Sequence, residues 1–153
     1  MKKNFGKYAI VDPVKHVFEK EPQWYWMIKA PTAVDELNVA RILSTQRSAI
    51  QPDGTRLELL PMTLEIALRE VAVTFAGTNI PMSETDPTPI LKTDAKWEDV
   101  EEVLKDMPRE MLSELWIAVG EAVPGWGPAK KLSDKWKKKS LDEADQLPGE
   151  PKN

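Results

Sequence analysis

The sequence predicts an α+β fold that is mainly α: a small N-terminal β-hairpin or strand pair packs on about four helices, and a flexible C-terminal tail follows. An aromatic run between two prolines indicates a strand, and four later segments space their apolar residues as helices do. The C-terminal end is polar and rich in lysine, proline and glycine. A length of 153 residues fits one domain, placed at 1–128, with a flexible charged tail at 129–153.

Two short strands are expected before the first helix. Residues 7–12 are one candidate, and residues 23–30 are the stronger one because they carry the run Trp-Tyr-Trp-Met-Ile. Aromatic and β-branched residues are enriched in strands because they pack well on a pleated surface. We expect these two segments to form the strand pair.

Strand alternation divides the aromatic run into two apolar faces. One face carries Trp24, Trp26 and Ile28, and the other carries Tyr25 and Met27. The two indoles have more area and gain more from burial. Tyr25 and Met27 are therefore expected to be the face that stays partly open to a partner.

The first helix is expected from Thr32 to about residue 48. Thr32 is a suitable N-cap, and Asp35 and Glu36 place negative charge in the first turn. The apolar residues expected to face the core are Val34, Leu37, Ala40, Ile42 and Leu43.

The second helix, at residues 63–76, is apolar nearly all round and is expected at the centre of the core. Its main stripe consists of Leu64, Ala67, Leu68, Val71, Ala72 and Phe75. Glu70 is assigned to the polar side, and Arg69 to an i,i+4 pair with Glu65. Gly77 and Asn79 are expected to end the helix in a left-handed cap.

The second half is expected to hold two more helices. Residues 80–93 are predicted to be a loop, and residues 95–106 a helix. Pro108 opens the last helix, which is expected to stop near Gly120 and the proline- and glycine-rich segment 124–128.

Two tryptophans, Trp126 and Trp136, lie in a polar C-terminal region that has few other apolar residues. Large aromatic rings in such a region are expected to be covered by the body or by a partner. Leu132 and Trp136 would lie one turn apart on an amphipathic helix, and a solubilising disordered tail is the alternative. The candidate partner-binding residues are thus Tyr25, Met27, Trp126, Leu132 and Trp136.

Side chains for catalysis are sparse. The chain has no cysteine, and its one histidine, His16, is expected to be an isolated surface residue. Glu98, Glu101 and Glu102 are expected to form a solvated acidic face. We predict no catalytic, cofactor-binding or metal-binding residues and no enzyme activity. A small hydrolase using carboxylates is a third hypothesis, and it would require acidic residues that meet in a cleft.

Charge and hydropathy exclude other classes. A net charge of -4 gives no electrostatic case for nucleic-acid binding. No apolar run reaches the ~18 residues that a membrane span needs, and no apolar stretch follows the basic N-terminus as in a signal peptide.

The order of these segments resembles the tail assembly chaperones of long-tailed bacteriophages and prophages. The resemblance covers residues 5–128. It is carried by the aromatic strand and capped helix at 24–43, the segment at 64–80 and the closing Glu-Leu-Trp-Ile-Ala-Val-Gly-Glu-Ala-Val-Pro-Gly-Trp-Gly-Pro at 114–128. No functional residue can be transferred from that group one by one.

The resemblance implies a protein of the host cytoplasm that binds the tape measure protein, keeps it soluble and recruits tail-tube subunits during virion morphogenesis. It implies no cofactor, and it leaves open whether the protein is a homo-oligomer. The alternative is a structural virion component, such as a head-tail connector or tail-completion subunit. That alternative predicts stable rings and presence in finished particles.

Overall fold

The computed structural model describes residues 5–6, 12–47 and 62–128. The helices in these ranges are α1 (Ala33–Arg47), α2 (Met62–Val73), α3 (Trp97–Lys105) and α4 (Arg109–Ala122). The strands are β1 (Val14–Val17), β2 (Tyr25–Ile28), β3 (Phe75–Thr78), β4 (Pro81–Ser83) and β5 (Asp86–Pro89). The strand predicted at 7–12, apart from Asp12, and the tail predicted at 129–153 lie outside the described residues.

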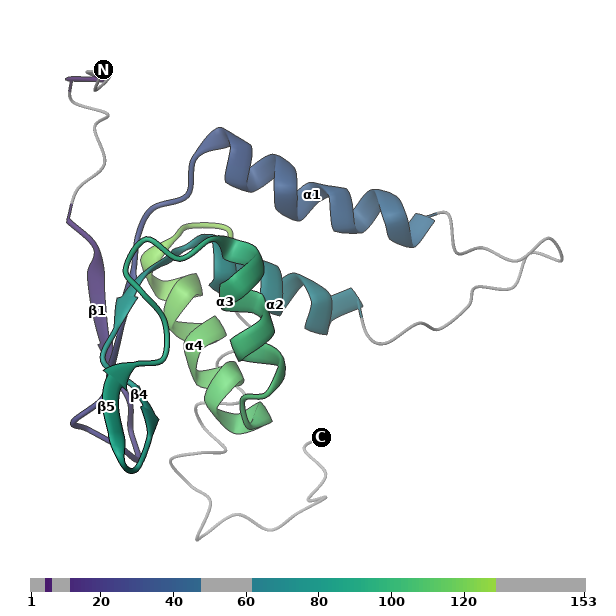
Figure 1. The fold of residues 1–153 in the computed structure, drawn as a ribbon. Coiled ribbons are helices and arrows are strands. Elements are labelled where there is room, and N and C mark those ends of the chain that lie inside the picture. Colours follow the sequence, from purple (N-terminus) through teal and green to yellow (C-terminus); the bar gives the residue numbers. More distant parts are fainter. Residues whose placement is uncertain (1–4, 7–11, 48–61, 129–153) are drawn as a thin grey trace, which may run out of the picture.

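The predicted fold class is wrong. The prediction was one strand pair at the N-terminus, whereas the described residues form two small antiparallel sheets. One sheet has the order β1-β2-β3, and the other consists of β4 and β5 (Figure 1). Strands therefore occupy the middle of the chain as well as its start. The four segments predicted as helices are all helical.

The end of α2 explains the first difference. The sequence predicts a helix through residue 76, but α2 ends at Val73 and Phe75 begins β3. The hydroxyl of Thr74 donates to the carbonyl oxygen of Glu70 at 2.7 Å and so satisfies one of the last carbonyls of the helix. β-branched and aromatic residues then favour the extended chain. Gly77, with φ 146°, lies in the strand and is not a helix cap.

The predicted loop 80–93 contains the second difference, the hairpin of β4 and β5. Its turn is closed by side chains, because Ser83 Oγ accepts from the backbone N–H of Asp86 at 3.1 Å. Asp86 Oδ1 accepts from the N–H of Thr88 at 3.0 Å. Prolines at positions 81 and 89 face each other across the two strands. A sheet of two strands tolerates them because each strand has an open edge that needs no donor.

The three-stranded sheet packs its inner face against α4. Trp26 and Ile28 are fully buried, and the Trp26 ring meets Phe75 in a T-shaped contact with centroids 4.9 Å apart. The pairing of β2 with β3 shifts between Met27 and Ile28, so three residues of β3 face two of β2. This bulge turns Phe75 toward the core and Gly77 toward the opposite face.

Helix α2 lies at the centre of the helical layer and contacts α1, α3 and α4, as its apolar composition predicted. Helix α1 lies on the outside (Figure 1). Its N-cap is confirmed: Thr32 Oγ1 accepts from the N–H of Asp35, and Asp35 Oδ2 accepts from the N–H of Thr32. These reciprocal bonds form a capping box.

The predicted apolar side of α1 is confirmed for Ile42 and wrong for Val34, Leu37 and Ala40, and the side chain of Leu43 lies outside the described residues. Val34 and Leu37 are 73% and 52% exposed, while Ile42 is buried and Asn38 faces α2. The side of α1 that faces α2 carries Asn38, which accepts a hydrogen bond from Arg69, so a polar contact stands where apolar packing was expected. Burial alone would have favoured the opposite orientation.

The core assignment predicts a large difference between two leucines. Leu115→Ala should lower the free energy of unfolding by about 2–5 kcal/mol, because Leu115 is fully buried on α4. Leu37→Ala, the matched control on α1, should change it by less than about 0.5 kcal/mol. Urea unfolding followed by circular dichroism measures both. Equal losses would contradict the assigned orientation of α1.

Candidate functional site

The outer face of the three-stranded sheet is the face opposite α4. The pairing of β1 with β2 places Val17 beside Tyr25 and Lys15 beside Met27. Met27 in turn lies beside Gly77 of β3. These five residues form the outer face, and they come from the consecutive strands β1 and β2 and from β3, which is distant in the sequence.

Burial differs sharply between the two faces of β2. Trp26 has an exposed fraction of 0%, whereas Tyr25 and Met27 are half-buried. Val17, beside Tyr25, is 46% exposed. The predicted division of the aromatic run is therefore confirmed for Trp26, Ile28, Tyr25 and Met27. Trp24, which was expected with the buried face, packs against the core but is only half-buried. The outer face thus presents the apolar side chains of Tyr25, Met27 and Val17.

Two further contacts shape the outer face. The ammonium group of Lys15 lies 4.7 Å from the centroid of the Tyr25 ring, a cation–π arrangement. At Gly77 an added Cβ would lie 3.7 Å from Met27 Cγ and 3.8 Å from Thr93 Oγ1. Met27 and Thr93 thus border the space beside Gly77, which has no side chain. The sequence did not predict that Lys15 and Val17 belong to this face, because residues 14–20 are mostly polar and gave no sign of a strand.

Trp126 packs against the hydrophobic core and is half-buried. The sequence predicted that this ring would be covered by the body of the protein or by a partner. In the structure the body covers part of it. Leu132 and Trp136 lie outside the described residues. The structure therefore brings Tyr25 and Met27 together and places Trp126 with the core.

The segment around Trp126 is held by Glu70. The Oε1 atom of Glu70 accepts from the indole N–H of Trp116 and from the backbone N–H of Gly127, each at 2.8 Å. Glu70 is only 6% exposed, so its assignment to a polar side is wrong. Burial raises the pKa of the Glu70 carboxyl, and the bonds from Gly127 and Trp116 oppose this rise.

Two glycines allow this segment to approach α4. A Cβ on Gly127, where φ is 83°, would lie 2.4 Å from Gly120 Cα. A Cβ on Gly120 would lie 2.8 Å from the carbonyl oxygen of Trp126. The helix was expected to stop near Gly120 and segment 124–128, and α4 does end there, at Ala122. The role of Gly120 is to let one backbone touch another.

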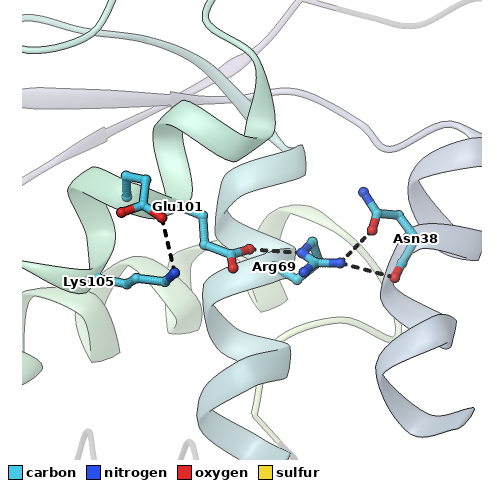
Figure 2. Close-up of polar contacts among 5 residues, drawn as sticks. Asn38, Arg69, Glu101 and Lys105 are labelled. Atoms are coloured by element: carbon cyan, nitrogen blue, oxygen red, sulfur yellow. Dashed lines mark hydrogen bonds and ion pairs between the residues drawn. The ribbon is translucent and has the colours of Figure 1, made fainter. Parts of the chain in front are cut away.

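Arg69 joins three helices (Figure 2). Its Nε donates to Glu101 Oε2 of α3 at 2.8 Å, and its Nη1 donates to the Asn38 side chain of α1. The guanidinium carbon lies 4.1 Å from the centroid of the Trp97 ring. The predicted pair with Glu65 is replaced by these contacts. Glu101 is therefore part of an ion pair and not of a solvated acidic face.

His16 has a carboxylate partner that its neighbours in sequence did not reveal. Its Nε2 lies 2.6 Å from Glu114 Oε2 of α4, and both side chains are 22% exposed. The same oxygen accepts from the backbone N–H of Glu19 at 3.0 Å. This pair ties β1 to α4, and the expectation of an isolated surface histidine is wrong.

In the described part of the chain, no three His, Cys, Asp or Glu side chains come together as a metal site would require. None of the helices in those ranges is long and apolar enough to cross a membrane. No protein-family model, no curated protein and no solved structure matches this chain.

Replacing Glu70 tests its role in the core. Glu70→Ala should lower the free energy of unfolding by about 1–3 kcal/mol, because the indole N–H of buried Trp116 loses its acceptor. Glu102→Ala is the matched control, since Glu102 is an exposed glutamate on α3. Its ion pair with Lys105 is also exposed, so the loss should be under about 0.5 kcal/mol. Similar losses in urea would contradict the assignment.

The raised pKa of Glu70 predicts a pH dependence. The folded protein binds this proton more tightly than the unfolded chain, so the stabilising contribution is complete below the ordinary value of 4.5. This contribution is lost as the pH rises through the pKa that Glu70 has in the folded protein. The Glu70→Gln variant cannot ionise at this position. The stability of the unmodified protein relative to Glu70→Gln should therefore fall from about pH 4 to pH 8 in urea unfolding. A constant difference would contradict this prediction.

Proposed function

We propose that this chain is a tail assembly chaperone of a long-tailed bacteriophage or prophage. In this role it binds the tape measure protein in the host cytoplasm and recruits tail-tube subunits. The proposal rests on the resemblance of residues 5–128 to that group and on the outer face of the sheet. It requires no cofactor and no chemical step.

The observation that carries the proposal is the contrast between the two faces of β2. Trp26 and Ile28 close the core, while Tyr25 and Met27 remain half-buried beside the exposed side chain of Val17. Tyrosine gives a large contact area at a low cost in conformational entropy, and methionine adapts its shape to different partners. Such a face suits apolar segments of a long helical client.

The polar contacts of the described residues support binding rather than catalysis. Glu70 holds the segment after α4, Arg69 joins three helices, and the Glu114 side chain holds His16 and the backbone of Glu19. Each of these groups is engaged in holding elements together. None of them meets a second acidic group in a cleft, as the hydrolase hypothesis would require.

The test is capture of the tape measure protein by a double variant. Tyr25→Ser with Met27→Ser should reduce co-purification of co-expressed tape measure protein by about tenfold or more, because the two residues supply the large apolar side chains of the outer face. Val34→Ser with Leu37→Ser is the matched control. It removes two exposed apolar side chains from α1 and should leave capture unchanged.

Circular dichroism and urea unfolding establish that both double variants are folded. Undiminished capture by the folded sheet variant would move the binding site to Leu132 and Trp136. Purified phage particles separate the proposal from the alternative of a structural virion component. A chaperone should be absent from finished particles, and its presence there at a fixed stoichiometry would contradict the proposal.

A further inference from the structure

Strand β1 lies at the edge of its sheet, because the strand order is β1-β2-β3. The phase of its hydrogen bonds follows from one contact: the N–H of Phe18 donates to the carbonyl oxygen of Trp24 at 3.2 Å. In an antiparallel ladder, alternate residues turn their backbone groups toward the partner strand. Phe18, His16 and Val14 thus face β2. Lys15 and Val17 turn their N–H and C=O groups away from the sheet.

The edge is open and partly apolar within the described residues. No backbone–backbone hydrogen bond from another described segment reaches Lys15 or Val17. Val14 and Val17 are 53% and 46% exposed. An open edge strand with exposed valines is a template for pairing with another strand.

The charges beside this edge indicate which strand would pair with it. Lys15 lies two residues before Val17, and Glu19 lies two residues after it, in the bend that follows β1. Both side chains are exposed. When two such segments run antiparallel with Val17 opposite Val17, each Lys15 faces Glu19 of the other segment. Facing charges of opposite sign stabilise a strand pair, and facing valines add apolar contact.

The other registers in which two copies could pair are less favourable. A pairing centred on Lys15 places the two lysines opposite each other and extends to Pro13, which has no N–H to donate. A pairing centred on His16 places Lys15 opposite Val17. Only the pairing centred on Val17 combines opposite charges with an apolar centre.

We propose that two copies of this chain associate through β1, antiparallel and centred on Val17. The three strands of each copy then form one continuous sheet. The two Val17 residues exchange N–H···O=C bonds at the centre of the pairing, and the backbone ladder does not extend to Glu19, because β1 ends at Val17. The N–H of Glu19 already donates to Glu114, so it adds no bond between the copies. An interface this short gives a weak, reversible dimer.

Charge exchange in the full chain tests the register. Lys15→Glu alone sets Glu19 of one copy against a like charge on the other, and Glu19→Lys alone does the same with lysines. In sedimentation velocity over a concentration series, each single variant should dimerise at least about tenfold more weakly than the unmodified chain. Lys92→Glu is the matched control, because Lys92 is exposed in the loop after β5 and should leave dimerisation unchanged.

An equimolar mixture of the Lys15→Glu and Glu19→Lys chains makes the test specific. Every facing pair then has opposite charges, so the mixture should dimerise about as well as the unmodified chain. The chain with both substitutions should do so alone. A monomeric unmodified chain at every concentration would overturn the proposal. So would a dimer that neither single variant weakens, or two variants that do not associate when mixed. Circular dichroism confirms that each variant is folded.

Discussion

The buried carboxylate of Glu70 is the contact on which the packing of the helical layer depends. One oxygen atom accepts two hydrogen bonds, one from α4 and one from the segment that follows it. A carboxylate in the core costs free energy unless its acceptor capacity is used, so the two donors must stay in place. This requirement fixes Trp116 and Gly127 together. It also brings two backbones so close that only glycine fits at Gly120 and Gly127.

The helices were predictable because their signals are local. Thr32 and Asp35 form a capping box within four residues, and Val100 and Leu104 lie one turn apart on one face of α3. The strands were less predictable because their partners are distant in the sequence. The segment that becomes β3 continues a helical pattern, and only pairing with β2 decides its conformation. Tertiary pairing here overrides the local preference.

Part of the candidate site was predictable because its signal is also local. Strand alternation was enough to separate Tyr25 and Met27 from Trp26 and Ile28. It could not place Lys15 and Val17 beside them, because that requires the register of β1. Polar partners were also out of reach: Glu114 is 98 positions from His16, and Glu101 is 32 positions from Arg69. From the sequence alone, a glutamate on a helix is predicted to be a surface residue, because its hydrogen-bond donors are not visible.

The position of Gly127 late in the chain bears on how the protein folds during synthesis. Domains fold as the chain emerges, and the N-terminal parts emerge first. Glu70 leaves the ribosome well before Gly127, which is 57 positions later and provides its second donor. Until then the Glu70 carboxylate lacks one of its two hydrogen-bond donors. The hydrogen bond between Gly127 and Glu70 can thus form only after the final residues of the body have left the ribosome.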